Sequence, residues 1–217
     1  MYQLYYYPGN ANLAPHMLLE EIGVPYELVL VDRDQNAQRS PQYLKLNPNG
    51  RIPTLVDGDL VLFEAAAICL HLADRHPEAA LAPALGTPAR AEFYKWLVYL
   101  TNTLQAELLI YFYPERLAGD ASAAAAVKLR AQERVAEMLD LIEQTLAQRA
   151  TAGQGPYLLG SQYSAADAYL LMLCRWTRMM PHPARARSHL NRSLQAIAAR
   201  PAVARAFAGE AIEPPYF

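Results

Sequence analysis

The pattern of apolar and polar positions in the first eighty residues predicts short strands that alternate with helices. A Pro-Gly pair closes the first aromatic-rich run. Gly23 and Pro25 end the first helical run, because glycine favours a helix C-terminus and proline cannot continue the helix. Asp57-Gly58 between two apolar runs is a strong hairpin signal. The expected elements are strands at 2–7, 26–31, 54–56 and 60–63, and helices at 13–22, 41–46 and 65–75.

This order of elements predicts a mixed sheet with helices packed on it, an α/β domain of thioredoxin-like layout over residues 1–77. The first two strands should be parallel and joined by a right-handed crossover, whereas the hairpin makes the last pair antiparallel. Asn12 is expected to act as the N-cap of the first helix.

The pattern changes after residue 76, where a segment with three prolines and little periodicity predicts a linker at 78–87. Beyond it the apolar residues recur at helical spacing, so residues 88–217 are predicted to form an all-α bundle. Ser164 and Asp167 have the spacing of a capping box at a helix start. The helices are expected at 92–113, 121–148, 164–180, 188–199 and 202–208.

Composition and charge exclude several classes of protein. Apolar residues make up 53% of the 217 residues and charged residues 18%, so the chain can bury a sizeable core. A net charge of −2 gives no basic surface for nucleic acid. Cys69 and Cys174 each lie in an apolar helical run and are expected to be buried, reduced thiols. No leader and no long apolar run stand out, which predicts a cytoplasmic protein that does not enter a membrane.

The segment from Asn47 to Ile68 concentrates the features of a ligand site. Glu64 ends the second hairpin strand, and the helix that follows begins at Ala65. A helix start presents unpaired N–H groups and a positive dipole end to an anion, and a carboxylate beside it would hold a cation. The site therefore suits a ligand with an amino-acid head.

This segment resembles the glutathione-binding half of the glutathione S-transferase superfamily. The matching stretches are Asn47-Pro-Asn-Gly-Arg-Ile-Pro-Thr-Leu55 and Leu62-Phe-Glu-Ala-Ala-Ala-Ile68, and a further match covers residues 160–173. The resemblance implies a cis bond at Pro53 and a backbone pairing of Ile52 with the cysteinyl part of glutathione. It also implies that Glu64 and the N–H of Ala65 hold the γ-glutamyl head. Arg51 either meets the glycyl carboxylate or is solvated.

One position departs from the family pattern: Ala65 stands where the family usually has serine. The backbone N–H remains, but the hydroxyl contact to the ligand carboxylate is lost. We therefore expect glutathione to bind weakly.

Glutathione chemistry needs a thiolate, and the family places the group that stabilises it between Tyr6 and Asn12. The window from Pro8 to His16 resembles the bacterial beta class without a gap, but Ala11 stands where that class has its cysteine. We expect Asn12 as the donor to sulfur, with Tyr6 and then Asn10 as the alternatives.

By resemblance, the protein is a cytoplasmic, homodimeric enzyme of detoxification. It would transfer glutathione to a small hydrophobic electrophile, without a metal. The electrophile is expected to contact aromatic residues of the helical domain, namely Tyr111, Tyr113 and Trp176. Two alternatives stay open, a glutathione-dependent disulfide or peroxide reductase and a non-catalytic binding or scaffold protein.

Overall fold

The computed structural model describes residues 1–217, and these form two compact units. The first unit comprises Met1–Pro83 and Ala198–Tyr216, and the second comprises Ala84–Ile197 with the terminal Phe217. The expected boundaries put residues 88–217 in one helical domain, whereas the last helix and the tail after it group with the first unit. No helix combines the length and the apolar character needed to cross a membrane.

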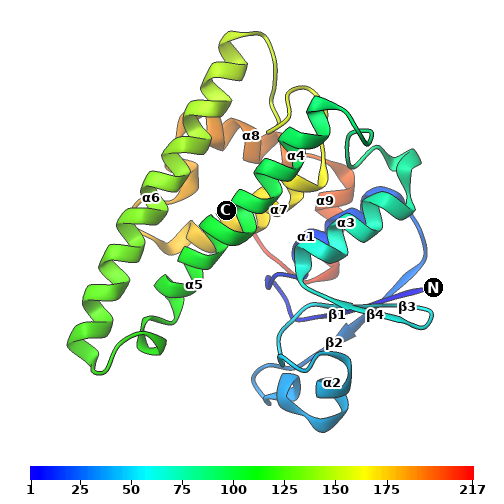
Figure 1. The fold of residues 1–217 in the computed structure, drawn as a ribbon, viewed down its shortest axis with the longest axis vertical. Helices are drawn as coiled ribbons and strands as arrows, with labels where there is room; N and C mark the ends of the chain where they lie inside the picture. Colours follow the sequence, from blue (N-terminus) through cyan, green and yellow to red (C-terminus); the bar gives the residue numbers. More distant parts are fainter. The chain divides into compact units, whose positions relative to one another are not determined.

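A four-stranded sheet with the order β2-β1-β3-β4 is the centre of the first unit (Figure 1). Strands β1 and β2 are parallel and the hairpin strands β3 and β4 are antiparallel, as predicted, and β3 also pairs antiparallel with β1. Asp57 pairs with Leu60, so Gly58 and Asp59 form a two-residue hairpin loop, with Gly58 at a φ of +60°. The strands are β1 (Tyr2–Tyr6), β2 (Tyr26–Leu30), β3 (Thr54–Asp57) and β4 (Leu60–Phe63).

The helices of the first unit cover the sheet. Helices α1 (Leu13–Ile22) and α3 (Ala65–Arg75) pack against each other on one face, and α2 (Pro41–Leu46) lies on the other (Figure 1). Helix α9 (Pro201–Gly209) packs along α1, which explains why it belongs to this unit rather than to the helical one. Short 3₁₀ turns occupy Ala37–Arg39 and Pro77–Ala79.

The second unit is helical, as predicted. Its helices are α4 (Pro88–Tyr99), α5 (Ala106–Phe112), α6 (Ala121–Thr151), α7 (Ala165–Trp176) and α8 (Ser188–Ala198), with 3₁₀ turns at Pro114–Arg116, Thr177–Met179 and Ala184–Ala186. The pattern predicted one regular helix over 92–113, but a π-helical segment, Leu100–Gln105, joins α4 to α5. The apolar positions keep roughly helical spacing through such a segment, so the pattern does not reveal it.

Two sequence predictions about the interior are confirmed. Cys69 and Cys174 are buried and unpaired, and burial raises the pKa of both thiols. The capping box at α7 is present, with the Asp167 carboxylate accepting from the Ser164 N–H at 2.9 Å. The same carboxylate accepts from the Leu158 N–H at 2.8 Å, so it also fixes the segment before the helix.

Candidate functional site

The turn before β3 is held by side chains that leave Ile52 open. Asn47 donates to the carbonyl of Arg51 at 2.8 Å and accepts from the N–H of Asn49 at 3.1 Å. The Tyr43 hydroxyl donates to the same Arg51 carbonyl at 2.7 Å. The Ile52–Pro53 bond is cis, as the resemblance implied.

The two backbone groups of Ile52 have no hydrogen-bond partner within the protein. They precede the first residue of β3 and present an unpaired N–H and C=O that an extended ligand segment can meet. The neighbouring Arg51 is exposed and forms no ion pair within the protein, so its guanidinium is available to an anion.

Glu64 and Ala65 lie where β4 passes into α3. Glu64 has a φ of +71°, a backbone conformation that is costly for a residue with a side chain and that concentrates at ligand sites. Its carboxylate is exposed and has no partner in the protein. Ala65 is the first residue of α3, so its N–H lies in the first turn and has no partner within the helix. An acceptor for a cation and a donor for an anion therefore stand at adjacent residues.

The Asn12 side chain is engaged within the protein. It is fully buried, with Nδ2 donating to Oε1 of Glu210 at 2.8 Å and Oδ1 accepting from the Tyr7 N–H at 3.2 Å. Asn12 occupies the N-cap position of α1, but its side chain makes no capping hydrogen bond. The expected capping role of this side chain is therefore wrong, and its amide is already engaged within the protein.

The other candidate donors between Tyr6 and Asn12 are arranged differently. The Asn10 amide is engaged as well, since its Oδ1 accepts from Nη1 of Arg33 at 2.7 Å. The Tyr6 side chain is half-buried and its hydroxyl has no partner in the protein. The backbone N–H groups of Ala11 and Asn12, at the start of α1, are unpaired too.

Sequence reasoning missed Glu210. This residue follows α9, nearly two hundred positions after the loop it contacts, and it is 1% exposed. Its carboxylate accepts from the Gly9 N–H at 2.8 Å as well as from Asn12, and lies 2.8 Å from Nδ1 of His16. No local pattern in the sequence marks an acid in the chain's tail as buried. The one signal was His16 itself, because a histidine within the apolar helix α1 needs a polar partner.

In the second unit, two of the three predicted pocket residues, Tyr111 and Trp176, lie in one aromatic neighbourhood. Tyr111 and Trp176 both contact the ring of Phe112, with centroid distances of 5.2 and 6.4 Å. Two cations accompany them: Nζ of Lys128 lies 4.9 Å from the Tyr111 ring, and the Arg116 guanidinium lies 3.9 Å from the Tyr113 ring. The neighbourhood is therefore aromatic with a basic border.

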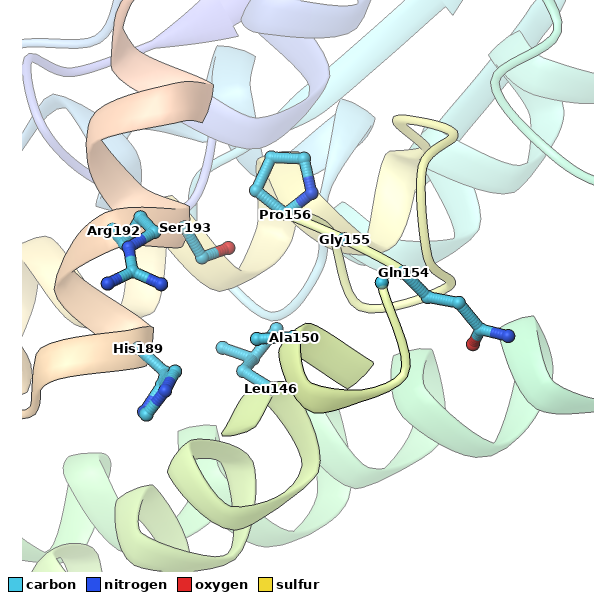
Figure 2. A pocket seen from close by; sticks show the side chains of 9 residues that line it. Leu146, Ala150, Gln154, Gly155, Pro156, His189, Arg192 and Ser193 are labelled. Atoms are coloured by element: carbon cyan, nitrogen blue, oxygen red, sulfur yellow. The ribbon is translucent and has the colours of Figure 1, made fainter. Parts of the chain in front are cut away.

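A separate hollow of about 240 Å³ lies elsewhere in the second unit, between the end of α6, the loop after it and α8 (Figure 2). It is lined in part by Leu146, Pro156 and Arg192, and the buried Ser193 hydroxyl has no partner there. None of the predicted site residues lines it.

Comparison with known proteins places this geometry in a family. Residues 1–74 match the glutathione S-transferase N-terminal domain, and residues 115–208 match the glutathione S-transferase C-terminal domain. Glutathione S-transferase 3 of Zea mays is 34% identical over 98% of this chain and 96% of its own length. The chain belongs to the glutathione S-transferase family.

Solved structures agree with this assignment to the transferase family. A glutathione transferase homologue from Sulfitobacter with bound glutathione superposes with a TM-score of 0.86, at 30% identity over 96% of this chain and 98% of the other. The beta-class glutathione S-transferase of Sphingomonas chungbukensis gives a TM-score of 0.82, at 30% identity over 97% and 100%. The predicted family, fold class and transferase function are thereby confirmed, and the reductase and scaffold alternatives are not favoured.

Proposed function

We propose that this transferase binds glutathione in its first unit and conjugates it to a small hydrophobic electrophile. The observation that carries the proposal is the pair formed by the free Glu64 carboxylate and the unpaired Ala65 N–H. This pair follows β4 at the end of the hairpin where the open backbone of Ile52 precedes β3, because Thr54 pairs with Phe63. Glutathione offers a matching set of groups, namely an ammonium, a carboxylate and an extended peptide.

The proposed binding mode assigns one part of glutathione to each group. Glu64 accepts from the γ-glutamyl ammonium, and the N–H of Ala65 donates to the γ-glutamyl carboxylate at the positive end of α3. Ile52 pairs its backbone with the cysteinyl residue, and Pro53 holds that edge. The exposed Arg51 pairs with the glycyl carboxylate.

Thiol activation requires donors that stabilise a negative sulfur. A free thiol has a pKa of about 8.5, and lowering it by about 2 units takes roughly 2.7 kcal/mol of preferential thiolate stabilisation. Hydrogen bonds to charged groups contribute about 1.5–3 kcal/mol each. We assign this role to the unpaired backbone N–H groups of Ala11 and Asn12, with the free Tyr6 hydroxyl as the side-chain donor.

In the reaction, the thiol loses its proton to solvent and the thiolate attacks the electrophilic carbon. A carbon–sulfur bond forms as the leaving group departs with its electron pair. Tyr111, Tyr113 and Trp176 would contact an aromatic or apolar electrophile through their rings. We further propose that the enzyme is a cytoplasmic homodimer, as in the family it belongs to.

Titration calorimetry with glutathione and a turnover assay with 1-chloro-2,4-dinitrobenzene test this function. We expect saturable binding and conjugation, with no faster turnover of a small disulfide. Tyr6→Phe should lower kcat/KM by about tenfold, the loss of one hydrogen bond to a charged group. Binding without conjugation would contradict the proposal and favour the non-catalytic scaffold. Preferential reduction of the disulfide would favour the reductase.

A further inference from the structure

The carboxylate of Glu210 joins three groups of the loop and helix that begin the proposed thiol site. Its Oε2 accepts from the Gly9 N–H at 2.8 Å, and its Oε1 accepts from Nδ2 of Asn12 at 2.8 Å. Nδ1 of His16 lies at the same distance from Oε1, and the side chains of both residues are fully buried. These three groups bracket Ala11 and the start of α1.

The hydrogen-bond directions around His16 follow from its other neighbour. The Tyr26 hydroxyl donates to Glu20, and burial together with that carboxylate raises the pKa of Tyr26. Nε2 of His16, 2.9 Å from the Tyr26 oxygen, must therefore donate to it. One proton is then shared between Nδ1 of His16 and Oε1 of Glu210, and the pair carries no net charge wherever that proton resides.

Electrical neutrality matters for a neighbouring thiolate. A buried unpaired carboxylate beside the site would disfavour a second negative charge, because like charges raise each other's pKa. Paired with His16, Glu210 can fix the loop without this penalty.

Gly209 lies where the tail approaches α1. A Cβ at this residue would lie 3.1 Å from Cε1 of His16, which is tighter than most Cβ contacts, and 3.4 Å from its Nε2. Glycine at this position lets the end of α9 come near enough for the next residue to reach His16. Gly209 and Glu210 thus contact His16 together: the small residue lies beside its ring, and the acid pairs with Nδ1.

We propose that Glu210 is a positioning residue for thiol activation: it holds Gly9, Asn12 and His16 so that the N–H groups of Ala11 and Asn12 point at the glutathione sulfur. This inference rests on the proposed function. It also gives Asn12 a role other than the one its sequence suggested, since its side chain anchors the loop while its backbone faces the ligand.

Glu210→Gln tests the proposal with minimal change in volume. A glutamine amide offers one acceptor oxygen and one donor nitrogen, so it cannot satisfy the Gly9, Asn12 and His16 groups together. One N–H is left without an acceptor, and the loop must shift to relieve it. Glu213→Gln is the matched control, because Glu213 lies in the same tail but is exposed and has no partner.

The readout is the pKa of the thiol of bound glutathione, followed by thiolate absorbance near 240 nm in saturated enzyme across pH. We expect Glu210→Gln to raise this pKa by about one unit. At a pH below the thiol pKa, this means about a tenfold smaller fraction of thiolate. The Kd for glutathione should change less. Glu213→Gln should match the wild type. Melting curves show whether each variant is folded at the assay temperature.

A folded Glu210→Gln enzyme with the wild-type thiol pKa would overturn the inference alone, because it would show a purely structural role. If Glu210→Gln does not fold, Asn12→Ala removes one donor, keeps the backbone N–H, and should raise the thiol pKa in the same direction; an unchanged pKa there also overturns it. A wild-type enzyme that binds no glutathione would overturn the proposed function, and this inference with it.

Discussion

Replacing Ala65 with serine should tighten glutathione binding. Ala65 is the first residue of α3 and is 5% exposed, next to the free carboxylate of Glu64. In the proposed binding mode its N–H already meets the γ-glutamyl carboxylate. A serine hydroxyl at the same residue would add a second donor to that carboxylate without moving the backbone.

The expected gain follows from the charge of the acceptor. A hydrogen bond to an ionised group contributes about 1.5–3 kcal/mol, and each 1.4 kcal/mol is tenfold in Kd. The dissociation constant should therefore fall by about ten- to a hundredfold. Helix stability should change little, because serine is only slightly less favourable than alanine and is well suited to a helix start.

Titration calorimetry on the wild type and on Ala65→Ser measures this directly. Ala67→Ser is the matched control: it adds the same hydroxyl to the same helix, about 200° around its axis. Only Ala65→Ser should lower Kd. An unchanged or weaker affinity would refute the reasoning that the γ-glutamyl carboxylate sits at the start of α3.

Two further predictions concern the interior. Cys69 and Cys174 are buried, and burial raises the pKa of their thiols, so neither should react with Ellman's reagent at pH 8 until the protein is unfolded; rapid reaction of the native protein would contradict their placement. Asp167→Ala removes the acceptor for the N–H groups of Ser164 and Leu158, and should lower the free energy of unfolding by about 2–4 kcal/mol in urea titrations. A loss below about 0.5 kcal/mol would show that water replaces these contacts.

The sequence predicted the fold well wherever local rules decide the structure. The Asp57-Gly58 signal predicted the hairpin, and Gly23 and Pro25 predicted the end of α1, which the structure ends at Ile22. The helical unit was also expected from its periodicity. The π-helical segment Leu100–Gln105 escaped notice, because its apolar residues keep almost the spacing of an α-helix.

The candidate site was predictable only in part. The groups expected at Ile52 and Glu64 depend on short-range geometry, and their backbone or carboxylate is indeed free in the structure. The choice of Asn12 as a side-chain donor failed to foresee that a distant acid engages its amide. Glu210 lies 198 positions along the chain from Asn12, and such a contact comes from tertiary packing alone.

A crystal structure of the protein with glutathione tests the central claim most directly. We predict the γ-glutamyl head between the Glu64 carboxylate and the Ala65 N–H, the cysteinyl backbone paired with Ile52, and the sulfur within hydrogen-bond distance of the N–H of Ala11 or Asn12. Glutathione bound away from the start of α3, or a sulfur facing away from the start of α1, would contradict the account.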